Sequence, residues 1–321
     1  MSEYEELNSL LRNFKFSITD LTSFENHIEN TLKGFPASKL QINKGRAVYR
    51  CRKYTLPVTD LYRFESQFSY RTDLQNINKF GRCNVPKNSI FYGSMLHSCH
   101  RNQMKPAQLA QFGYLTTIFE TSSLLNSSEK EGIEVYGVAM WEAKQDFEVT
   151  IIPPNSILRA NSGLANDLLS THEQHMETIG AENDIREFYD ILGKEFSKSM
   201  YGRPDSEYGI SALFSSHAIH SGGGIAYCSV KTDHKGFNIA LSPQKLDDNF
   251  VFVRAGLAEL WKFGNHPYFK FIATSERDFG IPLIYNDINN NSRQDVFDHF
   301  KNKGIKPNYI LEAFSKKIYT F

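Results

Sequence analysis

The stretch Phe80-Gly-Arg-Cys-Asn84, followed closely by Ser89-Ile-Phe-Tyr-Gly-Ser94, is the part of the sequence from which the fold can be built outward. The first segment predicts a tight turn, because Gly81 or Asn84 supplies the backbone freedom that such a turn needs. The second segment predicts a short apolar strand that carries a tyrosine. No turn requires Arg82, and its guanidinium is a rigid fork of donors suited to a phosphate or a carboxylate. The sequence therefore predicts that this turn meets an anion.

Composition narrows the class of protein. The chain has 321 residues, of which 40% are hydrophobic and 22% charged, and this balance is typical of a globular protein with a sizeable core. The formal net charge is zero and no long run of Lys or Arg occurs, so we expect no direct contact with nucleic acid. The 25 Phe and 16 Tyr residues favour strand-rich packing and an aromatic-lined pocket.

Termini and cysteines indicate a cytoplasmic protein. The first residues, Met-Ser-Glu-Tyr-Glu-Glu, lack the pattern of a signal peptide, and no apolar run approaches the ~20 residues of a membrane span. His97, Cys99 and His100 lie too close together for a complete tetrahedral metal site, so no metal is predicted. The cysteines have neither a zinc nor a redox spacing, which favours reduced thiols. They are Cys51, Cys83, Cys99 and Cys228.

The spacing of hydrophobic residues along the sequence predicts where the helices and strands lie. Helices are predicted at residues 7–14, 17–32, 106–125, 185–196, 205–222 and 292–303. Strands are predicted at residues 46–54, 90–93, 133–141, 147–152, 225–230, 237–241 and 249–254. This order predicts an α+β fold with mixed strands and surrounding helices. Residues 1–44 would form a helical N-terminal extension, residues 45–245 the main domain, and residues 246–321 an α/β C-terminal extension packed on the core.

Three consecutive glycines, Gly222-Gly-Gly224, stand between a predicted helix and a predicted strand. A phosphate-binding loop has the reverse order, strand to helix, and ends in Gly-Lys-Ser/Thr, which is absent here. The glycines therefore predict a helix stop and a flexible link.

Five short segments and one glutamate in a predicted helix, Glu120, occur in a definite order along the chain. The segments are Val48-Tyr-Arg-Cys51, Phe80-Gly-Arg-Cys-Asn84, Ile90-Phe-Tyr-Gly-Ser94, Gly224-Ile-Ala-Tyr-Cys-Ser-Val230 and Asn238-Ile-Ala-Leu-Ser-Pro243. In this order they resemble the RES-domain family over roughly residues 45–243. Cys83 stands where that family commonly has an aromatic residue, and Cys228 stands where it commonly has proline.

The resemblance implies a fold and a function. RES-domain proteins are best known as toxins of Res–Xre toxin–antitoxin pairs, their fold is similar to ADP-ribosyltransferases, and characterised members cleave the nicotinamide–ribose bond of NAD. For this chain it implies an ADP-ribosyltransferase-like core, NAD as substrate and no tightly bound cofactor. It also implies an Xre-type antitoxin protein as a partner.

Site residues follow from the same resemblance. Arg50 and Arg82 would hold the diphosphate or the nicotinamide ribose of NAD, since bidentate arginines suit phosphates. Tyr92 would border the nicotinamide ring. Glu120 would stabilise the oxocarbenium-like ribose and orient water or phosphate for attack. Ser229 would hydrogen-bond the ribose or the carboxamide, so Glu120, Arg50 and Ser229 form the predicted catalytic set.

Other interpretations of the same residues stay open. A mono-ADP-ribosyltransferase would use the same NAD site with a macromolecular acceptor. A catalytically inert RES-like interaction module would use the terminal extensions as docking surfaces. Taken singly, Arg50 is also compatible with a surface strand residue, Tyr92 with a core aromatic, and Ser229 with a buried hydroxyl bonded to backbone.

Overall fold

The computed structural model describes residues 2–15, 17–31, 36–96, 106–160, 162–200, 202–276, 286–287 and 294–306, with single residues at 283, 308, 312 and 318. Contacts between Cα positions divide the chain into two compact units. Unit 1 comprises Met1–Arg46, Tyr70–Thr116 and Ala143–Phe250, and unit 2 comprises Ala47–Ser69, Thr117–Glu142 and Val251–Phe321. The units are interleaved in sequence and do not follow the divisions at 44 and 245, which stay a prediction.

Unit 1 contributes five neighbouring strands of a mixed sheet. Their hydrogen-bonded order is β1-β5-β6-β7-β3, with β5 and β6 parallel and the other neighbours antiparallel. The short link between β6 and β7 allows only an antiparallel pair, whereas helices connect β5 to its parallel neighbour β6. The strands are β1 (Lys39–Ile42), β3 (Phe91–Met95), β5 (Phe147–Ile151), β6 (Gly224–Ser229) and β7 (Gly236–Leu241).

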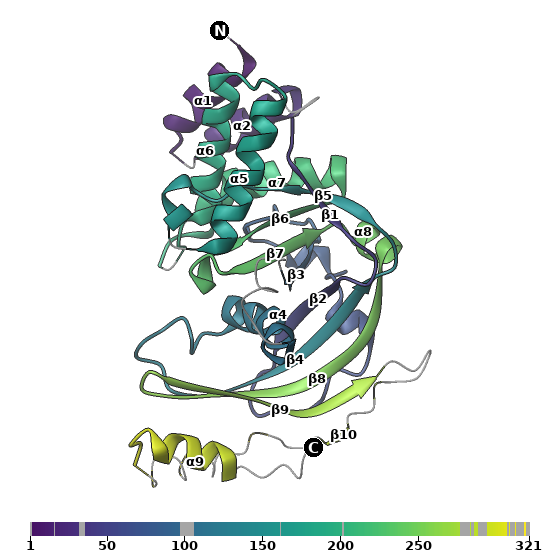
Figure 1. Ribbon diagram of the computed structural model, residues 1–321, viewed down its shortest axis with the longest axis vertical. Helices are drawn as coiled ribbons and strands as arrows, with labels where there is room; N and C mark the ends of the chain where they lie inside the picture. Colours follow the sequence, from purple (N-terminus) through teal and green to yellow (C-terminus); the bar gives the residue numbers. More distant parts are fainter. Residues whose placement is uncertain are drawn as a thin grey trace. The chain divides into compact units, whose positions relative to one another are not determined.

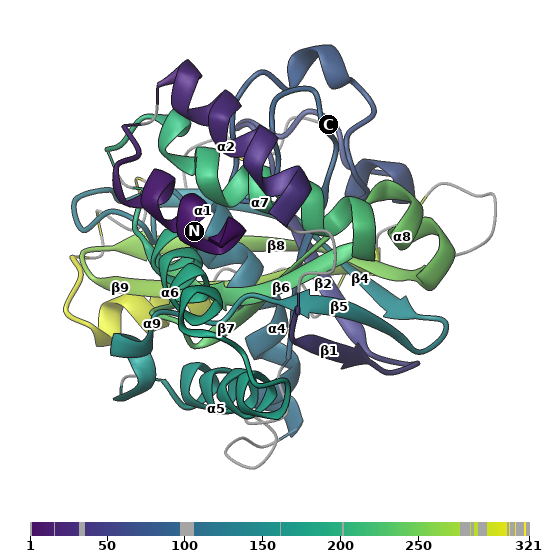
Figure 2. The ribbon, with the colours of Figure 1, turned by 90° about the horizontal axis from the view of Figure 1, so that it is seen from above.

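Helices surround these strands. They are α1 (Glu3–Arg12), α2 (Ile18–Thr31), α5 (Gly163–Thr178), α6 (Asn183–Ser197), α7 (Gly209–Gly222) and α8 (Pro243–Asn249). In Figure 1, α1 lies beside α6, and Figure 2 shows α2 running along α7 above β6. Phe24, Phe188, Phe214 and Ile225 from α2, α6, α7 and β6 meet in one buried cluster. Apolar faces with helical spacing therefore build the core of unit 1.

Local signals in the sequence fix several helix ends. The Ser2 side chain accepts from Glu5 N–H, and the Glu5 carboxylate accepts from Ser2 N–H, so a capping box begins α1. The glycine stop predicted after α7 is confirmed, because Gly223 has φ +78 and its N–H donates to Ile219 O. A Cβ atom at Gly223 would also lie 2.7 Å from Lys245 Cδ. Glycine is thus required there by both conformation and space.

Unit 2 is a second set of strands, in the order β2-β4-β8-β9-β10. Strand β2 (Ala47–Lys53) pairs antiparallel with β4 (Gly132–Ala143). Strands β8 (Phe250–Phe263) and β9 (His266–Glu276) form a long hairpin that turns at Gly264, where φ is +56. The hairpin packs with α9 (Gln294–Asn302) through Phe263 and Phe300, and β10 (Asn286–Asp287) pairs with β9.

One helix spans the sequence boundary of the units. Helix α4 (Pro106–Thr121) has its last turn in unit 2, where Thr117 lies against Cys51 of β2. The predicted α+β class with mixed strands is confirmed. Strand β1 and helix α5 were not predicted, and only residues 249–254 of the β8–β9 hairpin were predicted as a strand.

Candidate functional site

The five predicted site residues divide between the two units. Arg82, Tyr92 and Ser229 belong to unit 1, and Arg50 and Glu120 belong to unit 2. Each group has its own surroundings.

The turn at residues 80–84 is closed by hydrogen bonds. Gly81 N–H donates to Asn84 O at 2.9 Å, and the two residues form an isolated β-bridge. A Cβ atom at Gly81 would lie 2.4 Å from the Asn84 side-chain oxygen. Gly81 is therefore needed for space, not for the backbone freedom that the sequence suggested, since its φ is not positive.

Tyr92 holds this turn from strand β3. Its hydroxyl donates to Asn84 Oδ1 at 2.8 Å and accepts from Cys83 N–H at 2.9 Å. The ring packs against the buried cluster of unit 1. Burial raises the pKa of Tyr92 well above its ordinary value, so the hydroxyl stays a neutral donor. These contacts give Tyr92 a structural task in unit 1.

Arg82 meets the negative end of a helix. Its Nη1 donates to Phe196 O at 2.6 Å and Glu195 O at 3.3 Å, and its Nη2 donates to Lys198 O at 3.2 Å. The guanidinium carbon also lies 5.2 Å from the centroid of the Tyr208 ring, a cation–π distance. A helix C-terminus carries a partial negative charge and carbonyls without intrahelical partners, which a cation satisfies. In unit 1, Arg82 therefore binds backbone carbonyls at the C-terminus of α6, and the predicted anion stays a prediction.

Ser229 lies at the last position of β6, opposite Gly236 of β7. Its side chain is wholly buried. Its carbonyl accepts from His234 N–H at 2.8 Å and from the Thr232 hydroxyl at 3.2 Å, which closes the turn that follows β6. The predicted part of Ser229 in catalysis stays a prediction.

Arg50 occupies the middle of β2 in unit 2, paired in register with Ala139 of β4. The side chain is half-buried. Its neighbour Cys51 points to α4, where the Thr117 hydroxyl hydrogen-bonds the thiol. Side chains alternate along a strand, so Arg50 starts on the face opposite α4. Arg52 shares that face, and its Nη2 donates to Ser69 O at 3.0 Å.

Glu120 lies in the last turn of α4, one turn beyond Thr117, and is exposed. Contact between Cys51 and Thr117 makes β2 and α4 neighbours within unit 2. Unit 2 therefore brings together the strand that carries Arg50 and the helix that carries Glu120. The two side chains begin on different sides of β2.

A carboxylate that the sequence analysis did not single out organises this part of unit 2. Glu134 on β4 is buried, with 2% of its surface exposed, and it accepts six hydrogen bonds. The donors are the Lys53 ammonium, the hydroxyls of Ser122, Ser123 and Tyr136, and the N–H groups of Ser123 and Leu124.

The electrostatics of Glu134 follow from these donors. Burial acts to raise its pKa, but the hydrogen bonds, led by those of Lys53 and Ser122, outweigh burial and lower the pKa to about 2. Because Ser122 and Ser123 directly follow α4, Glu134 fixes the end of the helix that carries Glu120. A carboxylate inside an apolar strand pattern was the available sequence signal.

The surroundings of two cysteines, Cys51 and Cys83, keep their thiols protonated and therefore poorly reactive. Burial raises the pKa of Cys83 to about 12, and burial also raises the pKa of Cys51 far above its ordinary value. Both are therefore protonated thiols that pack. Within the described ranges no three His, Cys, Asp or Glu side chains are grouped so as to hold a metal ion. His97, Cys99 and His100 lie outside the described residues.

The chain was compared with protein families and with curated proteins. No family model matches the chain, and no curated protein matches it. Across the part of the chain that the structure describes, no helix combines the length and apolar character that crossing a membrane requires.

Proposed function

We propose that this protein consumes NAD by cleaving the bond between nicotinamide and ribose, in an ADP-ribosyltransferase-like core. The observation that most supports the proposal is that β2 and α4 are packed together in unit 2, through Cys51 and Thr117. These elements carry Arg50 and Glu120, an arginine and a carboxylate of the kinds that the reaction needs.

The reaction assigns a task to each residue. The bond between C1′ of the ribose and the pyridinium nitrogen breaks, and its electron pair returns to the ring, which leaves as neutral nicotinamide. Positive charge develops on the ribose, and the Glu120 carboxylate would stabilise it and orient the attacking water. Water adds at C1′ and releases a proton, or phosphate adds in its place. Arg50 would hold the diphosphate in a bidentate grip.

Arg82 and Tyr92 enter the proposal differently from the expectation. The donors of Arg82 that face Glu195, Phe196 and Lys198 serve the end of α6, and the Tyr92 hydroxyl serves the turn. We therefore assign both residues to the framework of unit 1. Ser229 stays a predicted contact of the ribose or carboxamide, to be tested by Ser229→Ala.

The test is nicotinamide release from NAD by the purified protein, followed by chromatography with and without phosphate. We expect release by the natural protein and a loss of about 100-fold or more in Glu120→Gln, the scale of a missing acid–base group. Glu129→Gln is the matched control, because Glu129 is an exposed glutamate of the same unit. The proposal fails if the natural protein releases no nicotinamide above background, or if Glu120→Gln releases it equally well.

Labelled NAD separates the forms of this activity. Label transferred to protein or nucleic acid would identify a mono-ADP-ribosyltransferase, and free ADP-ribose or its phosphate would identify hydrolysis or phosphorolysis. If expression depletes NAD in the cytoplasm and a co-expressed Xre-type protein prevents this, the protein is the toxin of a pair.

A second candidate function is an inert RES-like interaction module. The observation that favours it is the engagement of Arg82 by the end of α6, which removes one of the two arginines expected to hold NAD. NAD binding separates the candidates, since an interaction module would show no heat of NAD binding in calorimetry.

A further inference from the structure

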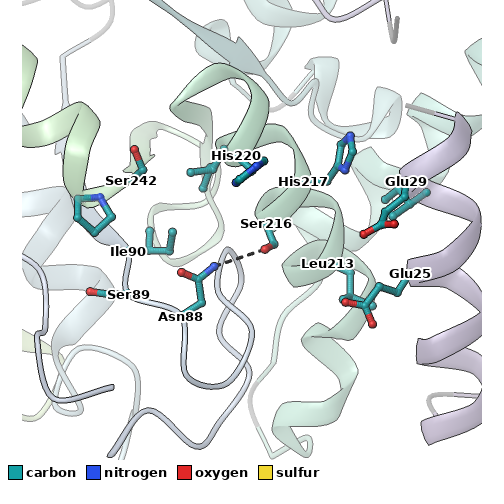
Figure 3. A pocket seen from close by; sticks show the side chains of 13 residues that line it. Glu25, Glu29, Asn88, Ser89, Ile90, Leu213, Ser216, His217, His220 and Ser242 are labelled. Atoms are coloured by element: carbon teal, nitrogen blue, oxygen red, sulfur yellow. Dashed lines mark hydrogen bonds between the residues drawn. The ribbon is translucent and has the colours of Figure 1, made fainter. Parts of the chain in front are cut away.

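A polar pocket of about 350 Å³ lies within unit 1, and none of the five predicted site residues lines it. Its walls come from α2, α7, the segment before β3 and the start of α8. In Figure 3 the carboxylates of Glu25 and Glu29 lie on one side, and Asn88 and Ser242 lie on the other. Pockets of this size suit small organic ligands.

Negative charge is concentrated at one end of the pocket. Glu25 and Glu29 stand one helical turn apart on α2, and the described residues that line the pocket include no Lys or Arg. Like charges four residues apart on a helix repel each other. Glu29 also lies in the last turn of α2, where the helix dipole disfavours a carboxylate and where no basic residue occurs. Both glutamates are exposed, so their charges are accessible to a ligand in the pocket.

Two imidazoles also line the pocket. His217 and His220 extend from α7, and Figure 3 places the His217 ring beside Glu29. Burial lowers the pKa of His217, an effect that Glu29 opposes and His220 reinforces. At neutral pH His217 is therefore a neutral imidazole with an acceptor nitrogen, and it leaves the charge of the carboxylates in place.

Apolar side chains also line the pocket. They are Ile28, Ile90, Leu213, Ile219 and Pro243. On the other side, the Asn88 amide donates to the Ser216 hydroxyl at 3.4 Å. The pocket thus offers carboxylates on one side, hydrogen-bonding groups on the other, and aliphatic side chains in its lining.

We propose that this pocket binds a small organic cation, an ammonium or guanidinium group on an aliphatic stem. The cationic group binds Glu25 and Glu29, and the stem lies along the apolar lining. Such a group belongs either to a free amine of the putrescine or agmatine type or to a lysine or arginine side chain. This site is separate from the proposed NAD chemistry and stands without it.

Calorimetry with putrescine and 1,4-butanediol tests the proposal, because the two molecules have the same length and differ in charge. We expect saturable binding of putrescine and none of the diol, and at least tenfold weaker putrescine binding in the double variant Glu25→Gln/Glu29→Gln. The matched control is Glu3→Gln/Glu6→Gln, which removes the same charge from exposed positions on α1 and should change affinity less than twofold.

Agmatine and a blocked lysine, Nα-acetyl-lysine methylamide, distinguish the sources of the cation. Binding of a free amine supports a metabolite ligand, and binding of the blocked lysine alone supports a peptide ligand. The proposal is overturned if no cation binds, if the diol binds equally well, or if the α1 control loses as much affinity as the α2 variant. Circular dichroism of both double variants verifies that each is folded.

Discussion

The turn at residues 80–84 in unit 1 and the β2–α4 pair in unit 2 contain the same kinds of polar residue but use them differently. In the turn, Arg82 donates to three carbonyls at the end of α6, and Tyr92 binds the turn backbone. In the β2–α4 pair, the saturated group is Glu134, which accepts six hydrogen bonds.

This comparison shows that the surroundings of an arginine or a glutamate, and not its residue type, decide which groups in the fold it binds. A guanidinium next to a helix C-terminus donates hydrogen bonds to the carbonyls there, because these carbonyls carry partial negative charge and need donors. A carboxylate among hydroxyls and N–H groups accepts hydrogen bonds from them for the same reason. Substitutions of Glu134, Arg82 and Tyr92 test whether these residues hold the fold, and substitutions of Arg50 and Arg82 compare the two arginines directly.

The largest loss of stability is expected for Glu134→Ala. The change leaves Lys53 and several buried donors without their acceptor, and we expect the free energy of unfolding to fall by about 3 kcal/mol. Urea unfolding measures this. Glu129→Ala is the control, since an exposed glutamate should change stability by less than about 0.5 kcal/mol. Equal losses in both variants would contradict the anchoring task of Glu134.

The contribution of Glu134 to the free energy of unfolding should depend on pH. The pKa of Glu134 is about 2 in the folded protein, below the value of about 4.3 for a free glutamate. Because its folded-state pKa is depressed, its stabilisation is complete above about pH 5 and is lost as the pH falls toward 2. The difference in unfolding free energy between the natural protein and Glu134→Gln should therefore shrink over this range. A constant difference from pH 6 to pH 3 would count against the assignment.

Arg82→Ala should cost about 2 kcal/mol of unfolding free energy, since three hydrogen bonds from a charged group to helix carbonyls are lost. Thermal and urea unfolding measure the loss. Arg71→Ala is the matched control, because Arg71 pairs with Asp73 on the surface, where an ion pair contributes less than about 1 kcal/mol. If Arg82→Ala loses no more unfolding free energy than Arg71→Ala, Arg82 does not stabilise the C-terminus of α6.

Tyr92→Phe should cost about 1 kcal/mol, because Cys83 N–H and Asn84 Oδ1 lose their partner in the turn. Tyr70→Phe is the control, since it removes an exposed hydroxyl that donates to Asp247. Hydrogen exchange should show faster exchange of Cys83 N–H in Tyr92→Phe and an unchanged rate in the control. Unchanged exchange in Tyr92→Phe would show that the hydroxyl does not hold the turn.

Local patterns were sufficient to predict much of the fold. The apolar spacing predicted α1, α2 and α6, and the strand patterns predicted β2, β3 and β4. These signals act within one element, so the sequence contains them in full. Strand β8 was predicted only in part, because its length of 14 residues depends on pairing with β9, which is a contact between segments.

The surroundings of the site depended on contacts that sequence spacing does not reveal. The carbonyls that bind Arg82 come from residues 195–198, more than 110 positions away, so the sequence around the turn did not reveal them. Tyr92 and the turn it closes are only eight or nine residues apart, and their link was within reach of sequence reasoning. The buried carboxylate of Glu134 also had a signal, a charge within an apolar strand pattern.

The most direct test of the whole account compares Arg50→Lys with Arg82→Lys in one experiment that measures both unfolding free energy and nicotinamide release. Lysine keeps the charge but loses the fork of donors. We predict that Arg50→Lys keeps its stability and releases nicotinamide at least tenfold more slowly, while Arg82→Lys loses about 1 kcal/mol of stability and keeps its rate per folded molecule. The reverse result, a stable Arg82→Lys protein that has lost activity beside an active Arg50→Lys protein, would contradict the account.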